Sequence, residues 1–104
     1  MASGSSASAS ACMNQSRLHI VYHGHVQGVG FRYTVKNLAC GFEVVGLVRN
    51  LLHGTVELIV EGDRDECAAF RQAIQESGLG PMIRREEASW LPAQGGLRGF
   101  LIAG

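Results

Sequence analysis

The 104-residue sequence lacks features that mark several protein classes. Its three cysteines include no CxxC pair and are too few for a disulfide framework, which favours a reducing compartment and a cytoplasmic location. We interpret Cys40 and Cys67 as small, core-facing helix residues with free thiols. Nine Lys and Arg residues balance nine Asp and Glu residues, so no net field attracts nucleic acid or an anionic membrane. Any anion site must therefore be local, and we expect neither nucleic acid nor a membrane as partner.

Residues 1–16 lack both the basic and the apolar segment of a signal peptide. They are rich in Ser, Ala and Gly, a composition that buries too little apolar surface to order a chain. No stretch of the sequence is long and apolar enough to cross a membrane. We predict a disordered tail over 1–16 and a single domain over 17–104.

Familiar phosphatase and nucleotide motifs are also missing. The sequence has no Cys-x₅-Arg loop and no GxxxxGK loop. The Asp63-Arg64-Asp65 segment superficially resembles the DxD of aspartyl phosphatases. It follows a glycine and opens a predicted helix, however, so we predict that Asp63 is a helix N-cap.

Three histidines are the best candidates for metal ligands. His19 and His23 share one face of the first predicted strand, and His25 has the same parity but follows the strand, so a two-histidine metal contact is possible in principle. No carboxylate or cysteine lies near them in the sequence to complete a site. We predict surface-facing histidines, no metal site and no other cofactor.

The hydrophobic periodicity alternates between strand and helix. Alternating apolar residues predict strands over 17–24, 44–51, 55–61, 83–91 and 97–102, with 52–54 as a hairpin tip. Helical spacing predicts one helix over about 31–40 and a second from Asp63 to Gly78, opened by a capping box with Glu66. The order βαββαβ, with the last strand region split, predicts an α+β, ferredoxin-like sandwich in which two helices cover one face of an antiparallel sheet.

The most informative segment links the first strand to the first helix. It reads Gly24-His25-Val26-Gln27-Gly28-Val29-Gly30-Phe31-Arg32. Its three glycines allow consecutive N–H groups to point into one concavity, and the start of a helix adds free N–H groups and a positive dipole end. Arg32 adds a planar fork of donors that suits phosphoryl oxygens. The segment predicts a phosphate-binding loop.

Three motifs after the tail resemble those of the acylphosphatase family. They are Gly24-x-Val26-Gln27-Gly28-Val29-x-Phe31-Arg32, then Gly46-Leu47-Val48-Arg49-Asn50, then Gly54-Thr55-Val56-Glu57. The resemblance implies a monomeric, metal-independent enzyme that hydrolyses small acyl phosphates. It implies that Arg32 binds phosphate and that Asn50 positions the attacking water. The phosphate-binding loop is then formed by His25, Val26, Gln27, Gly28, Val29, Gly30 and Phe31.

The sequence departs from the family pattern at three positions. Glu43 replaces a helix-ending glycine, which predicts a strained or reshaped end of the first helix. Leu47 replaces an aromatic residue and His53 replaces Asp or Asn, changes that affect packing and turn geometry. A non-catalytic module of the same fold, which binds a phosphorylated metabolite or docks a partner, remains an alternative. Phosphate release from a simple acyl phosphate distinguishes the two.

Overall fold

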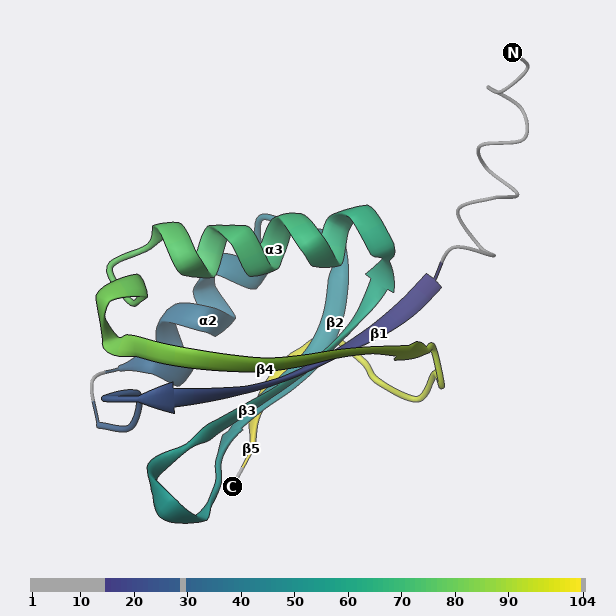
Figure 1. Ribbon diagram of the computed structural model, residues 1–104. Helices are drawn as coiled ribbons and strands as arrows, with labels where there is room; N and C mark the ends of the chain where they lie inside the picture. The colour runs from purple at the N-terminus through teal and green to yellow at the C-terminus, as the bar shows by residue number, and fades with distance from the viewer. Residues whose placement is uncertain (1–14, 29, 104) are drawn as a thin grey trace, which may run out of the picture.

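The computed structural model describes residues 15–28 and 30–103, which form two helices and five strands (Figure 1). In chain order the elements are β1 (Gln15–Gly24), α2 (Phe31–Ala39), β2 (Val44–Asn50), β3 (Val56–Asp63), α3 (Arg64–Glu76), β4 (Ile83–Pro92) and β5 (Phe100–Ala103), with 3₁₀ turns at Leu52–Gly54 and Gly80–Met82. The predicted order of elements is confirmed. Residues 1–14 of the predicted tail lie outside the described residues. Gln15 and Ser16 belong to β1, where they pair with Asp63 and Gly62.

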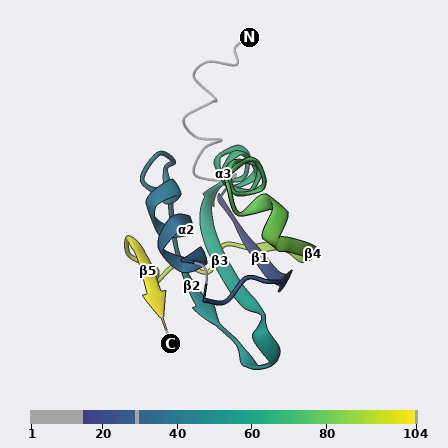
Figure 2. The ribbon, with the colours of Figure 1, turned by 90° about the vertical axis from the view of Figure 1, so that its left-hand side faces the viewer.

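The five strands form one sheet in the order β4-β1-β3-β2-β5, and both helices cover the same face of it (Figures 1 and 2). The pairs β1/β3, β1/β4 and β2/β3 are antiparallel, as predicted. The pair β2/β5 is parallel, so the sheet as a whole is mixed and the prediction of a purely antiparallel sheet needs this correction. The parallel pairing arises because the segment after β4 crosses the sheet and enters the opposite edge in the direction of β2.

The hydrophobic core fills the space between the helices and the sheet. The strand and helix stripes expected from the sequence are buried in it, among them Leu18, Ile20, Tyr22, Phe31, Val35, Val56, Leu58, Val60, Cys67, Phe70 and Ile74. Burial raises the pKa of the Cys67 thiol to about 11. Cys40 is exposed, so its predicted place in the core is wrong. Helix α2 ends at Ala39, and Cys40 lies beyond the buried face of the helix.

The helix ends explain one departure from the family pattern. The Asp63 carboxylate accepts a hydrogen bond from the Asp65 N–H at 2.9 Å, which confirms Asp63 as N-cap. Glu66 does not complete a capping box; its Oε1 accepts from the Glu43 N–H at 2.9 Å. Among the described non-glycine residues only His53 has a positive φ, so the strain predicted at Glu43 is absent. The segment after α2 is held by the first turn of α3 through this bond.

The other face of the sheet is crossed by the connection between β4 and β5. Glu61, on β3, points to this face and is only 5% exposed. Its carboxylate accepts from the N–H groups of Gln94 at 2.8 Å and Gly95 at 3.1 Å, and pairs with Arg17 at 2.6 Å. We call residues 93–99 the strap. Glu61 therefore binds the strap, the segment that connects β4 to β5, to the sheet.

Candidate active site

A glycine-rich loop leads from β1 to the first turn of α2. Gly28 has a φ of 80° and Gly30 a φ of 75°, in the left-handed region that glycine adopts without steric cost. A Cβ atom added at either position would have no neighbour within 4 Å. The requirement for glycine therefore comes from backbone conformation and not from crowding.

Helix α2 begins directly after this loop. Gly30 is the N-cap and offers no side-chain cap, and the Thr34 N–H is the donor to the Gly30 carbonyl at 2.9 Å. The N–H groups of the first turn therefore have no partner within the helix. The first turn holds no acidic residue but carries Arg32. Free N–H groups, the positive end of the helix dipole and a guanidinium together favour an anion.

Arg32 and Asn50 line the same cavity, of about 270 Å³. Asn50 is the last residue of β2, where pairing with Val56 of β3 fixes its backbone. The other lining residues are Val26, Gly28, Gly30, Phe31, Tyr33 and Ile102. The Asn50 Oδ1 atom is buried and has no hydrogen-bond partner among the described residues. A residue with an unpartnered side-chain acceptor thus lines the same cavity as the Arg32 guanidinium.

The side chain of Gln27 does not line this cavity. Its Nε2 donates to the carbonyl oxygens of Leu51 and Thr55, both at 2.8 Å. Leu51 follows Asn50, and the Leu51 N–H in turn donates to the Thr55 carbonyl at 2.8 Å. Gln27 therefore joins the loop to the turn that follows Asn50.

His25 and Val26 are neighbours in the loop but lie against different hollows of the molecule. The N–H of His25 donates to the Met82 carbonyl at 3.0 Å, and the residue lines a separate hollow with His23, Gly24 and Arg84. His25 is therefore not among the residues that line the cavity of Arg32. Val26 lines the Arg32 cavity and is fully buried. Val29, also predicted for this loop, lies outside the described residues.

Tyr33 and Ile102 also line the cavity, although neither was predicted as a site residue. Tyr33 is 69% exposed although it is aromatic, and its position directly after Arg32 was a usable signal. Ile102 reaches the cavity because β5 pairs in parallel with β2. No local pattern in the sequence predicts that pairing.

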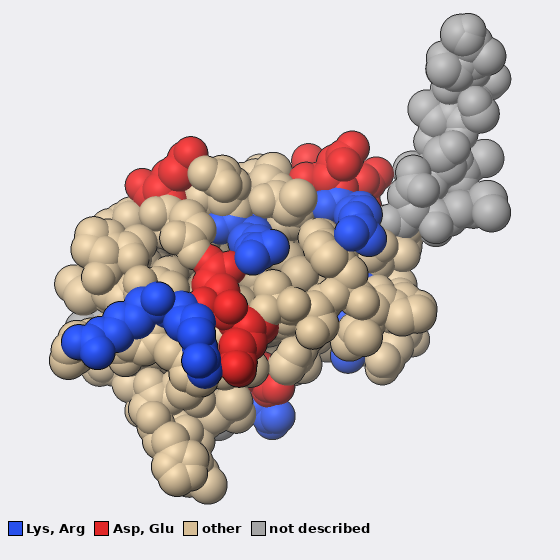
Figure 3. All heavy atoms as spheres, viewed as in Figure 1, with Lys and Arg blue, Asp and Glu red and all other residues tan. Residues whose placement is uncertain are grey.

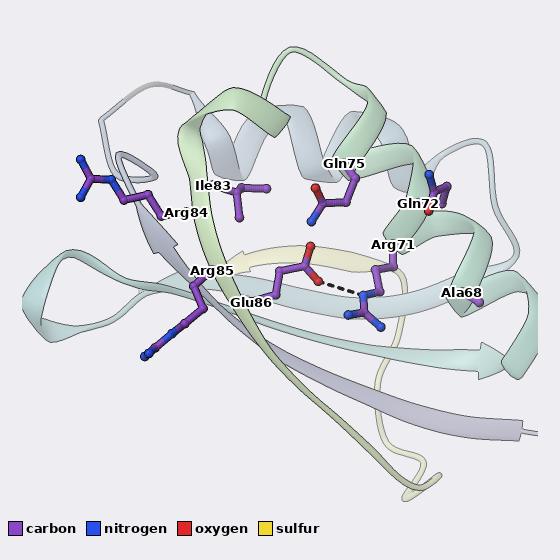
Figure 4. Close-up of a pocket in the computed structure, with 8 residues that line it drawn as sticks. All are labelled: Ala68, Arg71, Gln72, Gln75, Ile83, Arg84, Arg85 and Glu86. Carbon is purple, nitrogen blue, oxygen red and sulfur yellow. Dashed lines mark hydrogen bonds and ion pairs between the residues drawn. The ribbon is translucent and has the colours of Figure 1, made fainter.

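A larger hollow, of about 540 Å³, lies between α3 and β4 (Figure 4). Arg71 Nε pairs there with Glu86 Oε1 at 2.8 Å, while Arg84 and Arg85 point away from this pair. On this face of the molecule basic and acidic side chains lie next to one another (Figure 3). The positive charge of Arg71 is thus already compensated, and the hollow offers less to an anion than the cavity of Arg32.

The histidines of β1 contact carboxylates on neighbouring strands. His19 Nε2 lies 2.7 Å from Glu57 Oε2, and His23 Nε2 lies 3.2 Å from Glu87 Oε1. Within residues 15–28 and 30–103, no three His, Cys, Asp or Glu side chains gather in a metal-binding group. Over the same residues, no helix has the length and apolar character needed to cross a membrane.

Comparison with known proteins adds to this geometry. The sequence profile of the Acylphosphatase family matches residues 18–102. The chain belongs to the acylphosphatase family. An acylphosphatase of Thermococcus kodakarensis is 37% identical over 92 residues, which cover 88% of this chain and all of the relative. One of Nocardia farcinica is 37% identical over 84 residues, covering 81% of this chain and 84% of the relative.

A solved structure leads to the same family. The crystal structure of acylphosphatase from Bacillus subtilis superposes with a TM-score of 0.78 at 28% identity, covering 86% of this chain and 99% of that one. The predictions of the family and of a ferredoxin-like α+β fold are confirmed. As an acylphosphatase, the chain is an enzyme of acyl phosphate hydrolysis, which was also predicted.

Proposed function

We propose that Arg32 and Asn50 are the catalytic residues for acyl phosphate hydrolysis in the cavity between the loop, α2 and β2. In this proposal Arg32 and the N–H groups of the loop and of the first turn of α2 bind the phosphoryl group. Asn50 holds the attacking water. The observation that carries the proposal is that Arg32 and Asn50 line one cavity, and that Asn50 has a buried side-chain oxygen without a hydrogen-bond partner among the described residues.

The chemistry needs few protein groups. An acyl phosphate is a mixed anhydride, and its leaving group is a carboxylate that departs without a general acid. The water oxygen attacks phosphorus, the bond between phosphorus and the acyl oxygen breaks, and its electron pair leaves with the carboxylate. The proton of the water passes to a phosphoryl oxygen. The protein has to neutralise charge and place the water in line with the breaking bond.

The two side chains match these two tasks. The Arg32 guanidinium presents parallel N–H donors that bind two phosphoryl oxygens at once. The Asn50 amide carries both a donor and an acceptor, so it can orient a water without taking its proton. Arg32 acts on the ground state and on the transition state. Asn50 acts chiefly on the transition state.

The proposal extends to the substrate, the oligomeric state and the location of the enzyme. The substrate is a small acyl phosphate and the protein a cytoplasmic monomer. The thiols of Cys40 and Cys67 are free, which suits a reducing compartment.

The experiment measures acetyl phosphate hydrolysis and, by calorimetry, inorganic phosphate binding for the wild type, Arg32→Ala, Arg32→Lys and Asn50→Ala. Arg64→Ala is the matched control, because it removes a guanidinium that lies over Trp90 at 4.1 Å and not at the cavity. We expect Arg32→Ala to lose turnover and phosphate affinity together. Arg32→Lys should stay poor because a point charge does not reproduce the fork.

Asn50→Ala should still bind phosphate while kcat falls by roughly 10²-fold or more, about 3 kcal/mol of transition-state stabilisation. Wild-type turnover in Asn50→Ala would refute its water-positioning role. Phosphate binding without turnover in the wild type would favour the non-catalytic alternative.

A further inference from the structure

A separate hollow lies where the glycine-rich loop leaves β1. It measures about 370 Å³ and is lined by His23, Gly24, His25 and Arg84. We call it the histidine hollow. The cavity of Arg32 shares none of these lining residues. Arginine offers only donors, and a histidine ring donates from one nitrogen when neutral and from both when protonated, so this lining favours an anion.

Backbone packing fixes the two sides of the histidine hollow relative to one another. Gly24 ends β1 with a φ of 133°, and a Cβ atom there would clash with the Met82 carbonyl oxygen and lie 2.8 Å from the backbone nitrogen of Arg84. The His25 N–H donates to the same Met82 carbonyl at 3.0 Å. The end of β1 therefore packs directly on the start of β4. Walls that are fixed in this way lower the cost of ordering a site when a ligand binds.

The positive charge of Arg84 is not compensated. Other arginines form ion pairs with glutamates, namely Arg17, Arg49, Arg71 and Arg85. Across residues 15–28 and 30–103, neither the Arg84 guanidinium nor the His25 ring has a hydrogen-bond or ion-pair partner. Figure 4 shows that Arg84 points away from Glu86, the nearest acidic neighbour along β4. Both side chains therefore keep their donors for a ligand.

One carboxylate lies near the histidine hollow. Glu87 Oε1 lies 3.2 Å from His23 Nε2, and Glu87 Oε2 accepts from Arg85 Nη2 at 3.1 Å. Glu87 does not line the hollow, and its charge is shared between these two groups, so it leaves Arg84 and His25 without a counter-charge. A metal ion is disfavoured, because the Arg84 guanidinium would repel it.

The donors of the histidine hollow come from two sides. Arg84 is on β4, and His25 follows β1. An arginine fork engages two oxygens of a single phosphate or carboxylate group, which leaves the histidine side for a second such group. We propose that the histidine hollow binds a small anion that carries two or more phosphate or carboxylate groups. The site takes no part in the bond changes at the cavity of Arg32 and does not depend on the proposed function.

The test measures the binding of pyrophosphate, citrate and inorganic phosphate by calorimetry in Arg32→Ala, a background that removes the guanidinium of the other cavity. We expect pyrophosphate, citrate or both to bind, and to bind more tightly than phosphate. Adding Arg84→Gln should weaken that binding about 10-fold, the scale of one charge-assisted hydrogen bond, and adding His25→Gln should weaken it less. Arg64→Gln is the matched control and should leave it unchanged, because it removes an equal charge from a guanidinium that lies over Trp90. Urea unfolding checks that each variant is folded.

The choice of probes separates the two ligand sources. Binding of pyrophosphate alone would support a phosphate ligand, and binding of citrate alone a polycarboxylate. Failure of both to bind, or equal affinities with and without Arg84→Gln, would overturn the proposal. Phosphate binding as tight as that of pyrophosphate would refute the need for two anionic groups.

A second measurement locates the site without any variant. In the wild type, the NMR signals of His23, Gly24 and His25 should shift as the bound probe is added. Shifts confined to Gly28 and Gly30 would place the probe at the cavity of Arg32 and contradict the proposal.

Discussion

The side-chain amide of Gln27 donates a hydrogen bond to the backbone carbonyl of Leu51 at 2.8 Å, which links the glycine-rich loop to the residue after Asn50. A second bond from the same nitrogen reaches the Thr55 carbonyl at 2.8 Å. Loop and β2 come from distant parts of the sequence, and these two bonds set their relative position. We infer that Gln27 is a positioning residue that acts through Asn50.

We predict that Gln27→Leu lowers kcat while phosphate binding is largely kept. The leucine removes both donors and leaves two carbonyl oxygens with fewer partners, which lowers the free energy of unfolding by about 1–3 kcal/mol. A shift of Asn50 relative to the loop misplaces the water, and rates are sensitive to such shifts. Steady-state assays, phosphate titration and urea unfolding measure the three effects.

Two further variants test whether the hydrogen bonds of Gln27 are responsible for the effect on kcat. Gln27→Glu has the same shape but directs a carboxylate at two carbonyl oxygens, so kcat should fall further than in Gln27→Leu. Gln72→Leu is the control, because Gln72 bonds only with Glu76 on the exposed surface of α3, at 2.9 Å. Equal kcat values for Gln27→Leu and the wild type would show that the loop and Asn50 keep their positions without this link.

His53 lies in a backbone conformation that is costly for residues with a side chain. Its φ is 67° and its ψ 22°, in the left-handed region. We predict that unfolding free energy falls in the order His53→Gly, wild type, His53→Val, because a β-branched residue is strained most there. In His53→Gly the removal of the left-handed strain should raise the free energy of unfolding by about 1–2 kcal/mol. The greater chain entropy of glycine in the unfolded state offsets part of this gain. Urea unfolding measures the order. Leu52→Val, at the preceding position, is the control and should change the free energy of unfolding by less than about 0.5 kcal/mol.

The parts of the structure that the sequence predicted are those with local or periodic signals. The alternation of Leu18, Ile20 and Tyr22 predicts β1 and its buried face because strand side chains alternate. The pairing of Arg32 with Asn50 was predictable from the family motifs, and both line one cavity. An effect on turn geometry was expected at His53, where the family pattern has Asp or Asn, and the structure shows a left-handed backbone there.

The parts that the sequence did not predict depend on contacts between distant segments. The parallel pairing of β5 with β2 has no local signature, and it alone brings Ile102 to the cavity. The alternation along β3 places Glu61 on the face of the sheet away from the helices, where nothing local in the sequence indicates that the strap buries it. Cys40 fits the helical spacing, but the helix ends one residue earlier.

We predict that turnover does not require a divalent metal ion. Arg32 and the N–H groups at the start of α2 supply the positive charge that a metal supplies in other phosphoryl-transfer enzymes. Turnover should be the same in buffer with and without EDTA. Phosphate affinity, measured under the same two conditions, should also stay the same. Loss of activity in EDTA that one added metal restores would revive the histidines of β1 as candidate ligands.

The last prediction concerns the pH dependence that Glu61 gives to stability. Burial by itself raises the pKa of this carboxyl, but the Gln94 amide, the Arg17 guanidinium and the Gly95 amide outweigh it and hold the pKa below its usual range. A carboxyl whose pKa is lower in the folded than in the unfolded protein stabilises the fold above the unfolded pKa, about 4.5. That contribution is lost as the pH falls through the lower, folded pKa.

Glu61→Gln should therefore be less stable than the wild type at pH 6–7, by about 1–3 kcal/mol, because Arg17 is only 15% exposed and loses its charged partner. The difference should shrink as the pH falls below about 4.5, since the carboxyl of the unfolded wild type takes up a proton there and the carboxyl of the folded protein follows only at its lower pKa. Urea unfolding of both proteins across this range measures it. Glu43→Gln is the control, because its backbone N–H, and not its carboxylate, bonds to Glu66. A difference between Glu61→Gln and the wild type that stays constant with pH would mean that Glu61 holds the strap by shape and hydrogen bonding and not by its charge.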